Sequence, residues 1–321
     1  RQPVWWGGDS EYHAPARTEP ISRLERDLES GKFVITAEVS PPLGTATGLL
    51  SRNIELLKDM VSAINFTDSA SASPRMSSMA CSSVAARLGA DPVLQIAARD
   101  KTRSGLQSDI MGANELGIRN VLCITGDNAR IGPSPTSNTN ILDVDAVQML
   151  WILRKMRDEG IYLDGREMKC PPRLFLGAAA SPFASEPKFQ ALREHKKVNA
   201  GAQFFQTNLI FDADGIDPWL EEIYRRGFID QVYILAGVTP VRSMRMAEHL
   251  QHKVPGVTIP GNIMKRFADT KPEDFEETGV QVALEIIDKL KSKQGINGLH
   301  LMSVGWEAIV PRIIKESGLA N

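Results

Sequence analysis

One carboxylate near the start of the chain occupies a position where chemistry is expected. Glu38 lies near the carboxyl end of the apolar run Phe33–Val39, and Pro41 and Pro42 follow it. Two prolines can continue neither a strand ladder nor a helix, so the chain must leave the sheet there. A charge at the end of a buried strand is costly unless it is paired. The residues alone leave two interpretations open: a Glu38 that points to solvent, or an acid that acts on a ligand.

A second carboxylate stands at a comparable place. Asp127 follows the apolar run Asn120–Ile124, separated from it by Thr125 and Gly126. Carboxyl groups placed at strand ends can exchange protons with a ligand when their surroundings adjust their pKa. We therefore expect Glu38 and Asp127 to carry the chemistry of this chain.

The other strand-end positions carry small residues, hydroxyls and amides, with few charges. Small residues let a large flat ligand lie against the backbone, and hydroxyls and amides can hydrogen-bond to its heteroatoms. The candidate contacts among them are Thr67, Gln95, Ala179, Asn208 and Thr239. No group of His, Cys or carboxylate residues has metal-ligand spacing, so we expect no metal site.

The elements that must position these residues alternate along the chain. Eight short apolar runs predict strands, and helical spacing of apolar residues fills the segments between them. The predicted strands are Phe33–Val39, Ala63–Phe66, Pro92–Ala97, Asn120–Ile124, Leu174–Ala179, Phe204–Thr207, Gln231–Leu235 and Leu299–Ser303. The predicted helices are Ser22–Ser30, Leu49–Met60, Leu106–Leu116, Val144–Arg157, Phe189–Asn199, Trp219–Arg226, Arg242–His252, Phe275–Lys291 and Val310–Glu316.

This alternation predicts an α/β protein with a parallel sheet. The runs are continuously apolar, as parallel strands covered by helices are. Eight strand–helix units in roughly 280 residues fit a (β/α)₈ TIM barrel of ordinary size. A doubly wound open sheet is the alternative, but it usually has a glycine-rich phosphate turn after the first strand. Here Glu38 and two prolines follow that strand, so the barrel is favoured. In a barrel, the strand ends named above meet at one mouth.

The composition of the chain limits which binding partners and which cellular compartment we expect. The chain of 321 residues has a formal net charge of −2 at pH 7. That balance argues against a nucleic-acid partner, and no apolar run approaches the roughly 20 residues of a membrane helix. Cys81, Cys123 and Cys170 fit neither a zinc nor a disulfide pattern. We therefore expect a cytoplasmic protein with no membrane span.

Residues 1–20 form a predicted N-terminal extension before a barrel domain that spans residues 21–321. The extension is rich in Pro, Gly and aromatic residues, and Trp5 and Trp6 lie near its start. Tryptophan and tyrosine often anchor protein interfaces. Two interpretations stay open: a flap over its own domain, or a segment that docks on a partner subunit in an oligomer or complex.

Five short segments resemble motifs of the methylenetetrahydrofolate reductase family, in the same order and at similar spacing. They are Ala37–Pro42, Thr125–Asp127, Lys196–Ala202, Gln206–Asn208 and Ala236–Val241. The resemblance implies a flavin-containing (β/α)₈ barrel that reduces 5,10-methylenetetrahydrofolate to 5-methyltetrahydrofolate by hydride transfer from reduced flavin. Gly177–Phe183 and the extension resemble a divergent branch found in acetogenic one-carbon metabolism. Reductases of that branch often work beside a small iron–sulfur or zinc-binding partner subunit.

The resemblance also implies roles for individual residues. Glu38 matches the general acid that protonates a folate nitrogen, so that the methylene bridge opens to an iminium that accepts hydride. That role needs a carboxyl whose pKa is raised by burial. Asp127 matches a carboxylate near the flavin and the pterin, where its charge favours hydride release. Lys197 matches a lysine at the flavin's phosphates, and its alternative is a solvated helix lysine.

Further contacts follow from the same resemblance. The implied flavin positions are Thr67, Gln95, Thr125, Gly126, Asp127, Ala179 and Lys197, and the implied folate positions are Glu38, Asp127, Asn208 and Thr239. Gln95, Thr125 and Trp306 replace basic residues of the familiar bacterial form, so the flavin is either FAD or FMN. The electron donor is either NAD(P)H or a partner subunit. Two other functions remain: a pterin-binding barrel methyltransferase without flavin, and a subunit for assembly or electron relay.

Overall fold

Eight parallel strands close into a barrel in the order in which they occur in the chain. The computed structural model describes residues 11–133 and 142–319; Trp5 and Trp6 of the predicted extension lie outside them. The strands are β1 (Val34–Val39), β2 (Ala63–Phe66), β3 (Pro92–Ala97), β4 (Asn120–Ile124), β5 (Phe175–Ala180), β6 (Phe204–Leu209), β7 (Tyr233–Val238) and β8 (Gly298–Met302). Each strand pairs with the next, and β8 pairs with β1. The predicted (β/α)₈ barrel is therefore confirmed, and the alternative prediction of a doubly wound open sheet is wrong.

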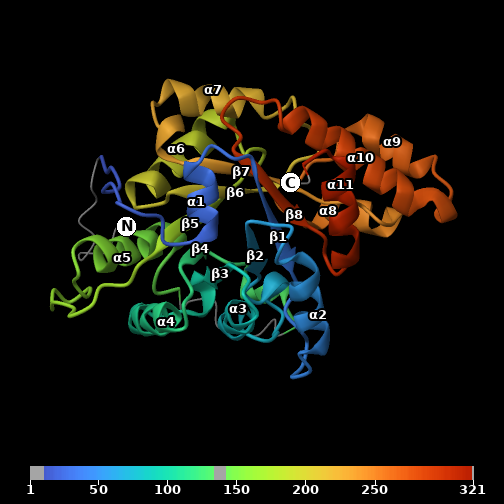
Figure 1. The fold of residues 1–321 in the computed structure, drawn as a ribbon. Helices are drawn as coiled ribbons and strands as arrows, with labels where there is room; N and C mark the ends of the chain where they lie inside the picture. The colour runs from blue at the N-terminus through green and yellow to red at the C-terminus, as the bar shows by residue number, and fades with distance from the viewer. Residues whose placement is uncertain (1–10, 134–141, 320–321) are drawn as a thin grey trace.

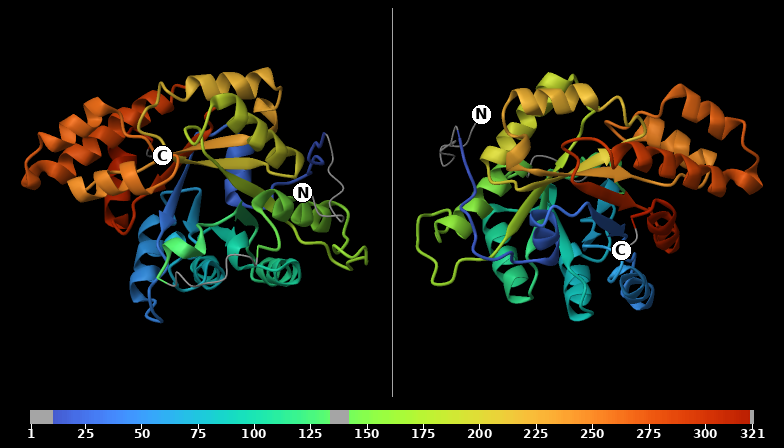
Figure 2. Two further views of the ribbon diagram at one scale, coloured as in Figure 1. Left: turned by 180° about the vertical axis from the view of Figure 1, so that it is seen from behind. Right: turned by 45° about the horizontal axis from the view of Figure 1, so that its top comes forward.

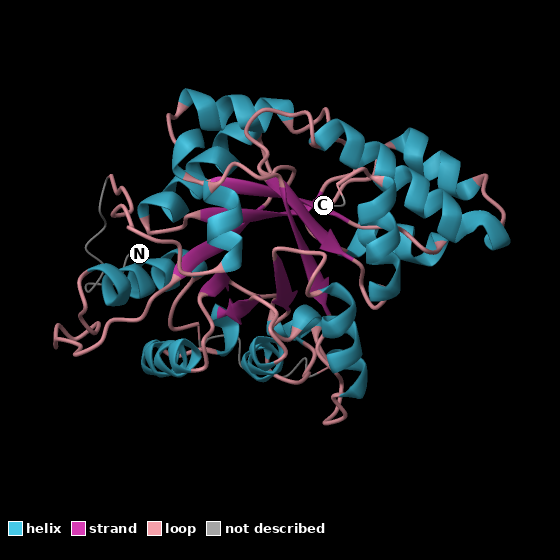
Figure 3. Cartoon of the chain, viewed as in Figure 1, coloured by secondary structure: helices cyan, strands magenta, loops and turns pink. Residues whose placement is uncertain are grey.

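Helices surround the strands, as Figure 3 shows. They are α1 (Arg23–Glu29), α2 (Gly48–Leu57), α3 (Ser78–Arg87), α4 (Arg103–Glu115), α5 (Ala146–Asp158), α6 (Pro187–Asn199), α7 (Asp217–Arg225), α8 (Met244–Lys253), α9 (Gly261–Ala268), α10 (Phe275–Leu290) and α11 (Val310–Glu316). Helices α4 and α6 are followed by glycines in the left-handed region, with φ of +80° at Gly117 and +117° at Gly201, as is common after helix ends. Helices α8, α9 and α10 form a group on one side of the barrel (Figure 2).

Two helices are absent from the sequence-based prediction. Helix α3 buries small side chains, Cys81, Ser82 and Ala85, so it lacks the large apolar residues that reveal a helical period. Helix α9 is strongly amphipathic but short, and it buries only Phe267. Strand β7 also begins two residues later than predicted, because the segment Ile229–Gln231 forms a 3₁₀ turn before it.

The end of the barrel at which the strands begin is sealed by apolar side chains. Seven strand residues pack there in one cluster with Leu24 and Leu28 of α1. They are Val34, Ala63, Val93, Leu122, Phe175, Phe204 and Leu235. Helix α1, drawn in blue in Figure 1, lies across this end. Ligands can therefore approach the barrel interior only from the opposite end, where the strands finish.

The next layer inside the barrel is polar. Thr36, Asn65, Gln206 and His300 come from four strands, are at most 3% exposed, and hydrogen-bond to one another. Because side chains two residues apart on a strand share one face, Glu38 lies one layer above Thr36, at the open mouth. The alternation of the strands thus carries the predicted acid into the mouth.

The described part of the extension lies against its own barrel. The Tyr12 hydroxyl donates a hydrogen bond to Asp158 at 2.5 Å, and the Arg154 guanidinium lies 4.4 Å from the centre of the Tyr12 ring. Arg17 pairs with Glu25 and donates to the Leu174 carbonyl oxygen. Docking of the Trp5–Trp6 segment on a partner stays a prediction.

Candidate active site at the barrel mouth

A cavity of about 320 Å³ opens at the carboxyl ends of β2, β3, β4 and β5. Its lining includes every residue predicted to contact flavin: Thr67, Gln95, Thr125, Gly126, Asp127, Ala179 and Lys197. These positions come from five separate segments of the sequence, and only closure of the barrel brings them together. Gly126 has φ of +83°, and a Cβ there would lie 3.0 Å from the Ala97 Cβ, so glycine is required for this close approach.

One wall of the cavity is formed by α6 and the end of β5. The ammonium of Lys197 donates a hydrogen bond to the Ala179 carbonyl oxygen, and burial lowers the pKa of Lys197. Behind this wall, Glu194 is 1% exposed and accepts hydrogen bonds from the Ser181 N–H, at 3.1 Å, and from the Trp219 indole. Burial raises the pKa of Glu194 to about 7. Lys197 is thus held against the strand end and is not a freely solvated helix lysine.

Asp127 is exposed at the rim, and its side chain is already engaged. Its Oδ2 accepts a hydrogen bond from the Ser71 N–H at 2.6 Å. The loop that supplies this N–H contains three non-glycine residues in the left-handed region: Ser69, Ser71 and Ala72. Such residues cost about 1–3 kcal/mol each, and they concentrate at ligand sites. The carboxylate can accept further hydrogen bonds from a ligand while the Ser71 N–H stays bound to it.

Two charged side chains connect the loops around the cavity. Arg99 donates hydrogen bonds to the carbonyl oxygens of Ser69, at 3.3 Å, and Asp127, at 3.2 Å. Asp68 accepts a hydrogen bond from the Ala97 N–H at 2.9 Å, and burial raises the pKa of Asp68. These contacts hold the ends of β2, β3 and β4 in a fixed relation at the mouth.

Glu38 lies beside the cavity and is linked to it through Gln95. Its side chain is 15% exposed. The Gln95 Nε2 atom lies 3.5 Å from Glu38 Oε2, and the His300 Nε2 atom lies 3.8 Å from the same oxygen. The carboxyl is therefore accessible from the mouth, and an amide and an imidazole face it.

Besides Glu38, two more predicted folate contacts are not part of this cavity lining. Asn208 donates to the Pro255 carbonyl oxygen at 2.9 Å and accepts from the Leu209 N–H. Thr239 is 3% exposed and donates to the Met302 carbonyl oxygen at 2.6 Å. Both side chains lie near the ends of β6 and β7, but their polar groups are used within the protein. Their contact with folate stays a prediction.

Sequence reasoning missed three polar residues that line the cavity: Asp68, Ser181 and Arg193. Arg193 lies four residues before Lys197 on α6, so helical spacing could have placed both cations on one face. Asp68 follows Thr67 directly and belongs to the same strand-end segment. The environment of Glu194 could not be inferred, because it depends on Trp219 from α7.

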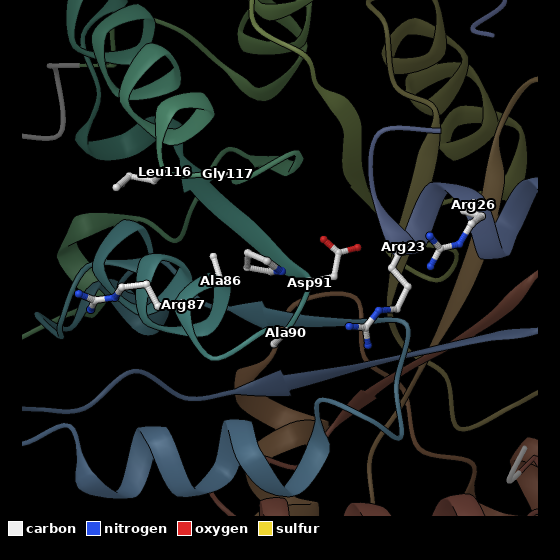
Figure 4. A pocket seen from close by; sticks show the side chains of 9 residues that line it. Arg23, Arg26, Ala86, Arg87, Ala90, Asp91, Leu116 and Gly117 are labelled. Carbon is white, nitrogen blue, oxygen red and sulfur yellow. The ribbon is translucent and has the colours of Figure 1, made fainter. Parts of the chain in front are cut away.

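A larger hollow, of about 520 Å³, lies at the opposite end of the barrel, between α1, α3 and the start of β3. Figure 4 shows that its arginines do not converge: Arg87 lies at one side, and Arg23 and Arg26 lie at the other. Arg23 donates to the Lys58 and Gly89 carbonyl oxygens, and Asp91 accepts from the Leu24 N–H. These side chains hydrogen-bond to backbone groups at the ends of helices and strands, which is a structural role. We therefore place the chemistry at the carboxyl end of the barrel.

The residues at the mouth fit a flavin. Hydroxyl, amide and small side chains can lie against a ring system rich in nitrogen and oxygen, and the cations Arg193 and Lys197 line the same cavity and suit a phosphate. Among residues 11–133 and 142–319, no group of three or more His, Cys, Asp or Glu side chains could hold a metal ion. No helix in these ranges is long and apolar enough to cross a membrane.

The fold and the site together define a (β/α)₈ barrel with a cavity at the carboxyl ends of its strands, where barrel enzymes have their active sites. The sequence pattern of the family described as methylenetetrahydrofolate reductase matches residues 23–318. The chain belongs to this family.

Several named proteins are similar to this chain. Methylenetetrahydrofolate reductase 1 of Schizosaccharomyces pombe is 24% identical over 241 residues, which cover 72% of this chain and 36% of that protein. A probable methylenetetrahydrofolate reductase (NADPH) of Caenorhabditis elegans is 22% identical over 249 residues, covering 74% and 34% respectively. The 5,10-methylenetetrahydrofolate reductase of Pectobacterium carotovorum is 21% identical, covering 68% and 66%. This chain spans about a third of the length of the two eukaryotic relatives.

A solved structure has the same fold over nearly all of both chains. It is an uncharacterized protein from Clostridium thermocellum that binds two copies of 5-methyl-5,6,7,8-tetrahydrofolic acid. The TM-score is 0.64 at 16% identity, and the match covers 92% of this chain and 96% of that chain. This similarity shows the shared fold alone.

Proposed function

We propose that this chain is a flavin-dependent reductase that converts 5,10-methylenetetrahydrofolate to 5-methyltetrahydrofolate. One observation carries the proposal: seven positions, assigned from motifs dispersed along the sequence, line one cavity, and Glu38 stands next to it across Gln95. Membership in the methylenetetrahydrofolate reductase family supports it. The bound flavin supplies the hydride.

Glu38 acts as the general acid. Its proton goes to the folate nitrogen that leaves the methylene bridge, the bond between that nitrogen and the methylene carbon breaks, and an iminium forms at the other nitrogen. Hydride addition to the iminium carbon then gives the methyl group. The position of Glu38, 15% exposed at the mouth, supports this role because the carboxyl can reach a ligand while protein groups face its other side.

Asp127 holds the pterin and disfavours negative charge nearby. Its carboxylate can accept hydrogen bonds from the amide edge of the pterin beside the one that it accepts from the Ser71 N–H at 2.6 Å. Thr67, Gln95 and Ala179 would lie against the flavin ring, and Lys197 and Arg193 would hold its phosphate region. Asn208 and Thr239 contact the folate through the donor and acceptor sites that their present hydrogen bonds leave open.

The flavin is FAD or FMN, and the donor is NAD(P)H or a partner subunit that contains an iron–sulfur cluster or zinc. We further propose a cytoplasmic location: Cys81, Cys123 and Cys170 are free thiols, as expected in a reducing compartment. Assembly into an oligomer or complex, with the Trp5–Trp6 segment at the interface, completes the proposal.

One experiment tests the function. The cofactor is released from purified protein and identified by mass, and methylenetetrahydrofolate reduction is then assayed with an artificial electron donor. Bound flavin together with methyltetrahydrofolate formation is the expected result. A colourless protein that transfers a methyl group from a pterin would replace the proposal with the methyltransferase function. A flavoprotein that is inert toward folate would favour a role in electron relay.

A further inference from the structure

Helix α6 contacts the end of β5 through two side chains that stand about one helical turn apart. Glu194 accepts a hydrogen bond from the Ser181 N–H at 3.1 Å, and the Lys197 ammonium donates to the Ala179 carbonyl oxygen. The other three residues line the cavity at the barrel mouth, whereas Glu194 lies behind them and is 1% exposed. An acid therefore lies just outside the cavity wall, next to a cation that forms part of this wall.

The Glu194 carboxyl is buried and accepts its two hydrogen bonds from uncharged groups. Its second oxygen accepts from the indole N–H of Trp219, which comes from the neighbouring helix α7 (Figure 1). Among the residues that the structure describes, neither Glu194 nor Lys197 has an ion-pair partner. A carboxylate removed from water without a paired cation is costly, and binding a proton removes that cost. Burial accordingly raises the pKa of Glu194 to about 7.

The charges that act on Glu194 come from its own helix. Lys197 and Arg193 oppose the effect of burial and lower the pKa of Glu194. The groups of α7 and of the end of β5 that contact this carboxyl carry no charge. Burial lowers the pKa of Lys197, and the carboxylates of Glu194 and of Asp145, the N-cap of α5, oppose that effect. The protonation states of Glu194 and Lys197 therefore depend on each other.

A phosphate at this end of the cavity changes the balance of charge around Glu194. Arg193 and Lys197 belong to the cavity lining, and such cations suit the phosphate of a flavin. A phosphate monoester adds about 1.5 to 2 negative charges near pH 7. Residues three apart on a helix are neighbours, with about 5–6 Å between their Cβ atoms, so a phosphate held by Lys197 brings its charge close to Glu194. A like charge nearby disfavours the ionised carboxyl and raises its pKa.

We propose that Glu194 takes up a proton from solvent when a phosphorylated flavin binds, and that this proton sets the preference of the cavity for a phosphorylated over an unphosphorylated flavin. The inference rests on the proposed function for the identity of the ligand. Once neutral, Glu194 no longer competes with the phosphate for the charge of Lys197. The pKa of Glu194 is higher in the complex than in the free chain, so phosphate binding is strongest at low pH and weakens as the pH rises through both values. A difference of one pKa unit changes the affinity about tenfold.

The indole N–H of Trp219 reports the protonation of Glu194 without the reaction, because it donates to that carboxyl. The chain has five tryptophans, and Trp219→Phe assigns the signal in ¹H–¹⁵N spectra of the flavin-free chain. On titration, this signal should move with a midpoint near pH 7. Saturating FMN or FAD should raise the midpoint by about one pH unit or more, and riboflavin, which has no phosphate, should leave it in place. An unmoved midpoint with FMN or FAD bound overturns the inference.

Calorimetry of FMN binding supplies the second arm. Between pH 7 and pH 9, wild type should lose about fivefold or more in affinity for FMN as Glu194 ionises. Glu194→Gln should lose much less, because only the other groups, such as the phosphate with its second pKa of about 6, still titrate. Glu186→Gln, which removes an exposed carboxyl at the start of the same helix, should follow wild type. Equal pH dependence in wild type and Glu194→Gln contradicts the proton uptake.

The two proposals fail in different ways. If no flavin binds, the proposed function fails, and inorganic phosphate then decides the inference through the same Trp219 signal. A midpoint that rises with phosphate supports proton uptake at Glu194, and an unmoved midpoint overturns it. If Glu194→Gln does not fold, the contrast between FMN and riboflavin in wild type decides.

Discussion

Replacing Glu194 with glutamine should remove a large part of the pH dependence of stability. The carboxyl is buried against Ser181 and Trp219, and burial raises its pKa from 4.5 to about 7. A pKa raised in the folded state means that the folded chain binds the proton more tightly than the unfolded chain. Its contribution to stability is therefore complete below pH 4.5 and is lost as the pH rises through about 7. At 1.36 kcal/mol per unit, the loss is about 3 kcal/mol.

The Glu194→Gln variant separates the pH-dependent loss of stability from a loss that is the same at every pH. Its oxygen can accept only one of the two hydrogen bonds, so the free energy of unfolding falls by about 1–3 kcal/mol at every pH. Urea unfolding of the flavin-free chain between pH 5 and pH 9 measures both terms. Wild type should lose about 3 kcal/mol more than Glu194→Gln over that range. Glu186→Gln, an exposed change at the start of the same helix, is the control and should follow wild type. A constant difference between wild type and Glu194→Gln would refute the reasoning.

Three further outcomes are expected. Glu38→Gln should lower folate reduction by about 10²-fold or more while flavin stays bound and reducible, and a wild-type rate would exclude Glu38 as the acid. Asp127→Asn should raise the flavin reduction potential and slow folate reduction, because it removes a negative charge beside the ring; spectroelectrochemistry that finds no change removes the electrostatic role. Gly177→Ala should cost about 1–3 kcal/mol by urea unfolding, because its Cβ would lie 2.3 Å from the Phe204 ring. Gly112→Ala, whose Cβ would meet nothing within 4 Å, should leave stability unchanged or slightly higher.

The barrel could be predicted because its signals are local. All eight strands lie within a few residues of their expected positions, since continuous apolar runs bounded by turns define buried parallel strands. Helix α3 was missed because its buried face consists of Cys81, Ser82 and Ala85, which give no contrast with a loop rich in serine. The family resemblance supplied seven positions that line one cavity, although no spacing rule shows that Thr67 and Lys197 lie together. Their contact with a flavin stays a prediction.

Hydrogen-bond partners could not be predicted, because they depend on which side chains meet after closure. Nothing near Asp127 in the sequence reveals that Ser71 donates to it, and nothing near His300 reveals Thr36, 264 positions away. The same limit applies to burial: whether a carboxyl is protonated near neutral pH depends on neighbours from other strands and helices.

Hydrogen bonds to Asn208 and Asp127 contribute little to folate affinity. The Asn208 amide donates to Pro255 and accepts from Leu209, and Asp127 accepts from Ser71, which leaves each group further sites for a pterin. A hydrogen bond from the pterin replaces one to water, so its net contribution to affinity is small. In the proposed function, the affinity for folate therefore comes mainly from stacking on the flavin. It follows that methylenetetrahydrofolate should bind much more weakly to the flavin-free chain than to the flavin-loaded chain, whereas Asp127→Asn and Asn208→Ala should each change that affinity far less. Equal affinity for the loaded and the flavin-free chain, measured by calorimetry, would contradict this order of contributions.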